Sequence, residues 1–160
     1  METGPWKQEP VEPVSFQVGL TDDKLAKEEP GLFRDICQRN LLQISMALLQ
    51  YIQDYDEKFP PASSWIDSVR AYLPNESFFH CPEGGGEYGY AFNRHLSTLS
   101  IAQVRHPSTT VMVYETKVRR RNHSGIGNDI DYRHEDGSFV AYCDGHASWR
   151  PKDHKLDFKP

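Results

Sequence analysis

The sequence predicts an α+β fold in which a long N-terminal amphipathic helix packs on a small antiparallel sheet. Three observations lead to this prediction. Apolar residues recur at intervals of three and four across 31–56, strand-like residues follow the glycine run at 84–86, and two Asp-Gly pairs flank a β-rich segment near the C-terminus. Helix therefore precedes sheet in the chain, which is the order of an α+β domain rather than of alternating βα units.

The chain of 160 residues has the length of one domain with additional terminal segments. Residues 1–30 contain four prolines among acidic residues, a composition that predicts a flexible leader. We place the domain at 31–152 and a C-terminal tail at 153–160. A net charge of −5 argues against nucleic acid as a partner, and the short basic run Arg119-Arg120-Arg121 is more typical of a solvated loop than of a nucleic-acid contact. No run of about 18 apolar residues occurs, so no membrane insertion is expected of the chain as written.

The long helix is expected to start after Pro30 and to end before the prolines at 60 and 61, because proline cannot continue a helix. About 25 residues at 1.5 Å per residue give a rod of roughly 38 Å. A second, short helix is predicted from Ser64 to Tyr72, with Ser64 as its N-cap. The apolar stripe of the long helix comprises Phe33, Ile36, Cys37, Leu41, Ile44, Leu48, Tyr51, Ile52 and Tyr55.

The two Asp-Gly pairs, 136–137 and 144–145, predict the turns of a three-stranded meander, since Asp-Gly favours two-residue hairpin loops. A two-residue second loop would place Cys143 opposite His146 and Val140 opposite Trp149. The same drawing places His134 opposite Phe139. The face of the meander expected to cover the helix carries Val140, Tyr142 and Trp149.

Several segments, taken together, resemble a known family. The stretch from Cys37 to Pro61 is similar to the helix that follows the membrane segment in type II secretion pseudopilin-like (type IV pilin-like) proteins of planctomycetes and related bacteria. His134, nine further residues and then Asp144-Gly145, followed by His146, resemble the C-terminal signature motif of that family. Between them, in the family's order, come Phe79-His-Cys-Pro82, Tyr88-Gly-Tyr-Ala-Phe-Asn93, Ile101-Ala-Gln-Val-Arg-His-Pro-Ser108 and Val111-Met-Val-Tyr-Glu115.

The resemblance implies a pilin-like fold, a structural or assembly role without enzymatic activity, and protein partners that include other pilin-like subunits. It also implies a location in the cell envelope. Family members usually begin with a basic leader, a cleavage site and about twenty apolar residues. Residues 1–30 differ from that pattern, so the expectation for the chain as written is a chain without an anchor, cytoplasmic if Met1 is its native start.

His134 and Asp144 are the residue types of a general-base pair, with the carboxylate orienting the imidazole. The meander separates them by about five residues along one strand, or roughly 16 Å, which argues against catalysis. The interpretation we favour is structural: Asp144-Gly145 supplies a turn that needs positive φ, and His134 ends a strand or bonds to backbone.

Thiol and imidazole groups offer one alternative, a metal site. Cys81, Cys143 and His146, with His80, are zinc-compatible ligands, although their spacing matches no known zinc module. A Cys81–Cys143 disulfide and separate buried thiols are the competing interpretations.

Carboxylates offer a second alternative. Glu115, Asp129, Asp131 and Asp144 lie at predicted strand ends and loops, where oxygen ligands can gather. The family resemblance implies calcium there, because major pseudopilins carry a calcium site in a C-terminal loop, but residues 125–131 lack the spacing of an EF-hand loop. We therefore expect no cofactor, and a ligand- or metal-binding module using calcium or zinc is the second functional hypothesis.

Overall fold

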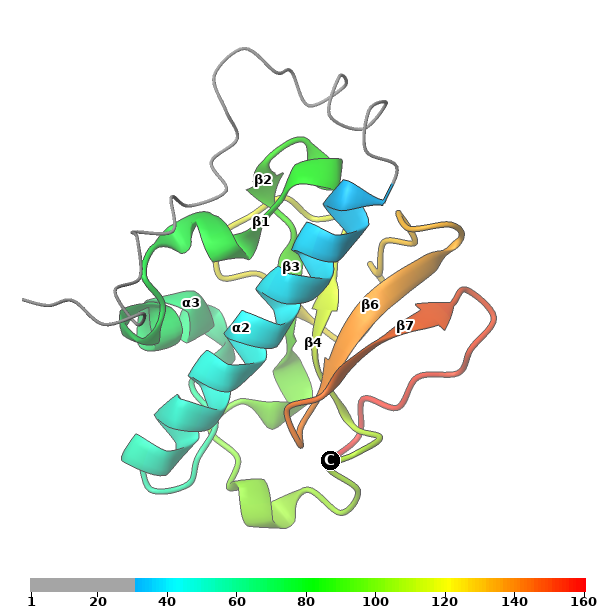
Figure 1. Ribbon diagram of the computed structural model, residues 1–160. Helices are drawn as coiled ribbons and strands as arrows, with labels where there is room; N and C mark the ends of the chain where they lie inside the picture. The colour runs from blue at the N-terminus through cyan, green and yellow to red at the C-terminus, as the bar shows by residue number, and fades with distance from the viewer. Residues whose placement is uncertain (1–30) are drawn as a thin grey trace, which may run out of the picture.

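The computed structural model describes residues 31–160 and has a mixed helix-and-sheet fold. Its main helix, α2 (Leu32–Asp54), runs across one face of an antiparallel sheet, as Figure 1 shows. The predicted α+β class and the predicted long helix are both confirmed. The flexible leader predicted at 1–30 lies outside the described residues.

Helix α2 begins at Gly31, whose φ of 92° starts the helix from the left-handed region that glycine adopts readily. It ends at Tyr55, and the positive φ values of Asp56 and Glu57 then turn the chain toward the prolines at 60 and 61. The buried side of α2 follows the predicted stripe. Its members are Phe33, Cys37, Asn40, Leu41, Ile44, Ser45, Ala47, Leu48 and Ile52.

The second helix is shorter than predicted and is capped differently. Helix α3 (Trp65–Val69) lies between two 3-10 turns, η1 (Ala62–Ser64) and η2 (Arg70–Tyr72). Ser64 makes no side-chain cap. Instead, the Asn122 side-chain oxygen accepts a hydrogen bond from the Ile66 amide at 2.7 Å. The Ile66 amide has no hydrogen-bond partner within the helix and is thus satisfied by a residue 56 positions away. Local sequence cannot reveal such a cap.

The sheet has five strands in the order β5-β3-β4-β6-β7, and a separate two-stranded ribbon pairs β1 with β2. All pairs in the five-stranded sheet are antiparallel except the short β3–β5 pair at its edge. The strands are β1 (His80–Cys81), β2 (Glu87–Tyr88), β3 (Tyr90–Asn93), β4 (Val111–Glu115), β5 (Ser124–Gly125), β6 (Gly137–Tyr142) and β7 (Ala147–Pro151). The remaining 3-10 turns are η3 (Glu76–Phe79), η4 (Pro82–Gly84), η5 (Arg94–Leu96) and η6 (Ile101–Gln103).

The predicted three-stranded meander is wrong in one respect, because strand β6 lies between β4 and β7. The segment before β6 contributes a single bridge, in which His134 and Gly137 exchange both backbone hydrogen bonds. His134 therefore lies opposite Gly137 rather than Phe139. The loop residues of this turn are Glu135 and Asp136, both at positive φ, as a type I′ turn requires.

The second Asp-Gly pair also forms a different turn from the predicted one. Tyr142, not Cys143, pairs with His146, so the loop has three residues and ends at Gly145 with a φ of +95°. A three-residue loop that ends in a left-handed glycine is the next most favoured hairpin after the two-residue loop. Trp149 consequently lies opposite Phe139, and the predicted pairing with Val140 is wrong by one residue.

This one-residue shift reverses which side chains face α2. Phe139, Ala141 and Trp149 belong to the core beneath the helix. Val140 and Tyr142, which were predicted there, lie on the opposite face of the sheet.

The opposite face is also covered, by a second apolar cluster to which the C-terminal residues contribute. The Phe158 ring meets the Tyr114 ring edge-on at 5.3 Å, and the Val111 amide donates to the Asp157 carbonyl at 2.8 Å. Residues 153–160, predicted as a tail, are therefore packed on the sheet. Across residues 31–160, no helix combines the length and the apolarity that crossing a bilayer requires.

Candidate functional site

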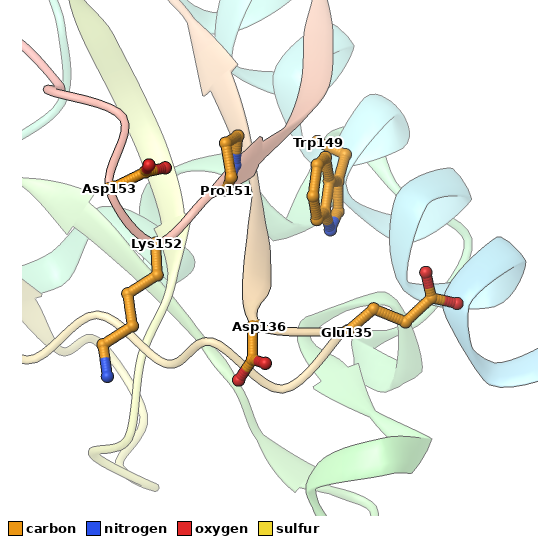
Figure 2. A pocket seen from close by; sticks show the side chains of 6 residues that line it. All are labelled: Glu135, Asp136, Trp149, Pro151, Lys152 and Asp153. Atoms are coloured by element: carbon orange, nitrogen blue, oxygen red, sulfur yellow. The ribbon is translucent and has the colours of Figure 1, made fainter.

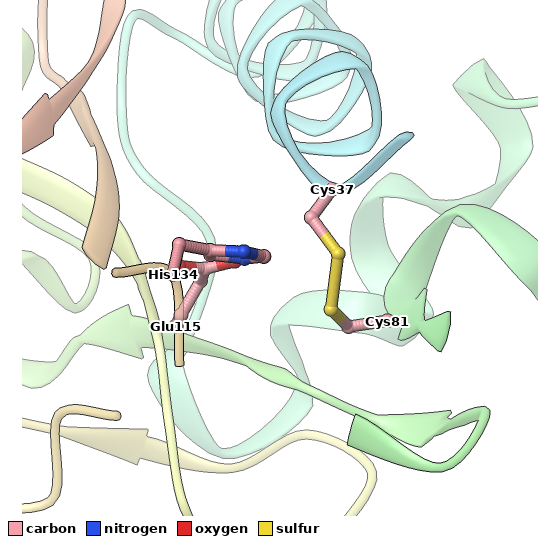
Figure 3. A group of neighbouring side chains, drawn as sticks. All are labelled: Cys37, Cys81, Glu115 and His134. Carbon is pink, nitrogen blue, oxygen red and sulfur yellow. A yellow bond between two sulfur atoms is a disulfide. The ribbon is translucent and has the colours of Figure 1, made fainter. Parts of the chain in front are cut away.

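A disulfide joins Cys37 of α2 to Cys81 of β1, with the two Cα atoms 5.6 Å apart (Figure 3). Both cysteines are fully buried. Of the interpretations left open by the sequence, a Cys81–Cys143 disulfide is therefore wrong, and separate buried thiols hold for Cys143 but not for Cys81. Cys143 stays outside any cross-link in the core, where burial raises the pKa of its thiol to about 12 and keeps it protonated at neutral pH.

Two ionisable side chains lie beside this disulfide. Glu115 is the last residue of β4, and His134 precedes the tight turn into β6; both are buried. His134 Nε2 lies 2.8 Å from Glu115 Oε1. Glu115 Oε2 accepts hydrogen bonds from the Phe139 amide at 2.8 Å and from the Ser138 hydroxyl at 3.2 Å. The buried carboxylate thus accepts two hydrogen bonds and also contacts the His134 ring, as a buried charge requires.

The other ring nitrogen of His134 faces a second carboxylate. Nδ1 contacts Oε2 of Glu83, on the 3-10 turn η4, but at an angle that makes no hydrogen bond within the described residues. Burial raises the pKa of Glu83, and the His134 charge only partly opposes that shift. His134 therefore lies between two carboxylates, and Nδ1 is a buried polar atom without a hydrogen-bond partner in this part of the chain.

The sulfurs of Cys37 and Cys81, a ring nitrogen of His134 and a carboxylate oxygen of Glu115 all lie within 4.8 Å of one another. Figure 3 shows the imidazole and the carboxylate side by side, with the disulfide across from them. These four ligands are of three types that bind zinc, namely cysteine sulfur, imidazole nitrogen and carboxylate oxygen. While the two sulfurs are bonded to each other they carry no thiolate charge, so this form presents a disulfide packed beside the paired imidazole and carboxylate.

The signature residues do not form a single site. His134 lies beyond the Gly137 end of β6 and Asp144 beyond the Tyr142 end, so the structure separates the two, as the sequence predicted. Asp144 Oδ1 accepts a hydrogen bond from the His146 amide at 3.1 Å and also contacts the His146 ring. Asp144 and His146 are both exposed. The predicted contact of His146 with Cys143 across a two-residue turn is absent from this hairpin.

The carboxylates predicted to gather as calcium ligands have separate partners instead. Asp129 accepts from the Tyr114 hydroxyl at 2.7 Å, the Thr116 hydroxyl at 2.6 Å and His123 Nε2 at 2.6 Å. Asp131 pairs with the guanidinium groups of Arg119 and Arg133 at 3.1 Å each. Of the metal ligands predicted from sequence, only Cys81 and Glu115 belong to the buried cluster.

An open pocket of about 580 Å³ lies at the far end of the β6–β7 hairpin. One face of the Trp149 ring borders it, and Glu135, Asp136 and Lys152 surround it (Figure 2). Glu135 is itself engaged by Arg34 of α2 at 3.3 Å. The pocket therefore presents an aromatic surface with acidic and basic side chains around it.

Sequence reasoning missed two members of the buried cluster. Cys37 was identified only as a position of the helix stripe, and His134 only as a motif residue. The burial of Cys37 on that stripe was the available signal, but its partner lies 44 residues away. Comparison of the chain with models of known protein families, with curated proteins and with solved structures finds no match.

Proposed function

We propose that this chain is a non-enzymatic, pilin-like structural or assembly module that contacts other copies of itself through the outer face of α2. The observation that carries the proposal is the pair of exposed apolar side chains on that face, Leu42 at 37% and Met46 at 55% exposure. The two residues are four positions apart and lie on one side of the helix. Methionine at an exposed helix position is typical of adaptable contact surfaces.

The arrangement of α2 supports a role in assembly. The helix is 23 residues long and one of its sides is buried in the core, so a partner can contact only its outer side. Polar residues, Gln43 and Gln50, flank the apolar pair and are exposed. A small apolar centre with a polar rim is the common anatomy of a protein–protein contact.

The signature motif has structural roles that agree with this proposal. His134 and Glu115 are buried between the sheet and α2, and Asp144 organises the hairpin turn through the His146 amide. The disulfide favours an oxidising compartment, since such bonds persist in extracytoplasmic proteins and are rare in the cytosol. A location in the cell envelope is therefore part of the proposal.

Sedimentation velocity over a range of protein concentrations tests the contact. We expect the parent chain to self-associate as concentration rises, and Met46→Lys to weaken that association. Asn128→Lys is the control, because it adds a positive charge at an exposed position outside α2 without removing apolar surface. A parent chain that stays monomeric throughout, or equal weakening by the two substitutions, would contradict the proposal.

A second candidate function is a metal-binding module on the same fold. The specific observation that favours it is the buried set of four ligand residues whose ligand atoms lie within 4.8 Å of one another. Metal analysis of the purified chain before and after reduction of its disulfide distinguishes the two candidates.

A further inference from the structure

We propose that Cys37, Cys81, His134 and Glu115 form a redox-controlled zinc site, closed by the disulfide in the oxidised protein and available to one Zn²⁺ after reduction. The proposal does not depend on the assembly function inferred above. It rests on ligand chemistry, ligand proximity and the polar environment of these four side chains.

The ligand set matches the chemistry of zinc. Zn²⁺ binds thiolate, imidazole and carboxylate, usually with four ligands in a tetrahedron. Bond lengths of about 2.3 Å to sulfur and about 2.0–2.1 Å to nitrogen or oxygen put neighbouring ligand atoms roughly 3.3–3.8 Å apart. The present ligand atoms already lie within 4.8 Å of one another, so the tetrahedron requires the two sulfurs to separate and Glu115 Oε1 to move away from His134 Nε2, which is now 2.8 Å from it. Calcium and magnesium, which prefer all-oxygen sites, do not fit this set.

The backbone already holds the ligands in place from four different elements. Cys37 is in the first half of α2, Cys81 ends β1, Glu115 ends β4, and His134 is locked in the turn before β6 by two backbone hydrogen bonds. The Cα separation of 5.6 Å between the cysteines reflects the close contact of α2 with β1. Ligands from rigid elements keep their geometry when one covalent bond is removed.

The imidazole is oriented as a zinc ligand needs. In metal sites, the ring nitrogen of histidine that does not bind the metal is usually held by a carboxylate or a carbonyl. Both ring nitrogens of His134 face carboxylates, Glu115 at Nε2 and Glu83 at Nδ1. Because Glu115 is itself a proposed ligand, ligation through Nε2 is the arrangement that leaves a separate carboxylate, Glu83, to hold the other ring nitrogen.

Nearby charge also favours the zinc form. Two thiolates, one carboxylate, a neutral imidazole and Zn²⁺ sum to one negative charge in a buried place. Arg133 lies close to Cys81, since a Cβ atom built on Gly89 would be 2.9 Å from Arg133 Nη1 and 3.0 Å from the Cys81 Cβ. Its Nη1 has no hydrogen-bond partner within residues 31–160. This guanidinium also pairs with Asp131 at 3.1 Å, and it adds positive charge beside the metal complex.

A dithiol reductant opens the disulfide and makes the two sulfurs available to the metal. The Cys37–Cys81 bond breaks, an S–S bond forms within the dithiol, and two hydrogens pass to the cysteine sulfurs. Zn²⁺ then binds the two thiolates and displaces to solvent both thiol protons, together with any proton on the His134 nitrogen that it binds. A disulfide oxidant reverses the sequence: its S–S bond is reduced to two thiols with protons from solvent, the Cys37–Cys81 bond forms and Zn²⁺ is released, so disulfide and zinc exclude each other.

The test uses the full chain, reduced with a trialkylphosphine, which takes up oxygen from water as it reduces the disulfide and binds zinc weakly. We expect the reduced chain to hold one Zn²⁺ after removal of excess metal, and the oxidised chain to hold none. Co²⁺ supplied in place of Zn²⁺ should give thiolate-to-cobalt charge-transfer absorption together with the visible bands of tetrahedral cobalt. Reduced protein that takes up no metal, or cobalt bound without thiolate absorption, would overturn the proposal.

Variants assign the ligands. His134→Gln keeps both cysteines and should weaken zinc binding about tenfold or more. Cys143→Ser and His146→Gln are the controls, because they remove a thiol and an imidazole outside the cluster, and both should leave the stoichiometry and affinity unchanged. Loss of binding in Cys143→Ser would overturn the assignment. Circular dichroism covers the case in which the reduced apoprotein unfolds: added Zn²⁺ should then restore the helix signal, and failure to restore it counts against the site.

Discussion

Removing the disulfide should lower the free energy of unfolding by an amount that the structure allows us to calculate. Cys37 and Cys81 are 44 residues apart. The loop-closure entropy of a cross-link of that length stabilises the folded state by about 4 kcal/mol at 25 °C. The free energy of unfolding of a small domain is about 5–15 kcal/mol in total, so the double variant Cys37→Ala, Cys81→Ala should remain folded but only marginally stable.

The alanines also remove two buried sulfur atoms, and Cys143→Ala provides the matched control for that loss. Cys143 is equally buried and has no cross-link, so its substitution measures packing alone. Urea denaturation, with a chelator present to exclude metal, gives all three free energies. We expect the double variant to lose about 4 kcal/mol beyond twice the loss in Cys143→Ala, with a larger m-value because its unfolded state is less compact. A loss no greater than twice that of the control would refute the entropic argument.

Three further predictions concern the sheet and its loops. Gly145→Val should cost more stability than Asp144→Asn in urea denaturation, because Gly145 has a φ of +95° and a Cβ there would lie 2.6 Å from a Leu49 methyl; an equal loss in Asp144→Asn would indicate a charge-dependent contact instead. Trp149→Ala should lower stability by about 2–4 kcal/mol, through lost packing and through the lost hydrogen bond from its Nε1 to the His134 carbonyl at 2.8 Å; a melting temperature within a degree or two of the parent would contradict this. Burial raises the pKa of Asp129, but the hydrogen bonds from Thr116, Tyr114 and His123 outweigh it and hold that pKa below its usual value. The contribution of ionised Asp129 to the free energy of unfolding is therefore present above about pH 4 and is lost as pH falls through the lower folded-state pKa. Urea titrations at several pH values should show that the free energy of unfolding falls less at acid pH in Asp129→Asn than in the parent.

The sequence was most informative about the helix. Its apolar period predicted a helix within 31–56, and α2 occupies Leu32–Asp54. The pattern works because one side of α2 is buried along its whole length, so the 3.6-residue period is uninterrupted.

The β6–β7 hairpin was located correctly but its register was not, and the first predicted hairpin is a single bridge whose turn has Glu135 and Asp136 as its loop. Asp-Gly is compatible with two-residue loops and with three-residue loops that end in a left-handed glycine, and only the flanking pairs distinguish them. Alternation could not settle the choice, because both faces of β6 are buried: Phe139 and Val140 are equally apolar and lie on opposite faces. In a sheet with one solvent-exposed face, alternation of apolar and polar residues would have indicated the register.

The candidate site was the least predictable part of the molecule. Its four residues come from positions 37, 81, 115 and 134, which no local spacing rule connects. The signature motif drew attention to His134 with Asp144, whereas the structure pairs His134 with Glu115 through a contact between the end of β4 and a turn. Such a contact depends on strand order, which the sequence did not determine.

The position of α2 has a consequence for how the chain folds. The helix comes early in the sequence, yet part of its cover is the β6–β7 hairpin, and Arg34 meets Glu135 at a separation of 101 residues. Closing such long loops is slow, so folding in milliseconds to seconds is expected rather than the microseconds of helical bundles. Until the hairpin arrives, the apolar stripe of α2 is exposed and open to association with other chains. Early formation of the Cys37–Cys81 bond would reduce the number of chain conformations to be searched during folding, because it fixes α2 against β1 before the last strands are in place.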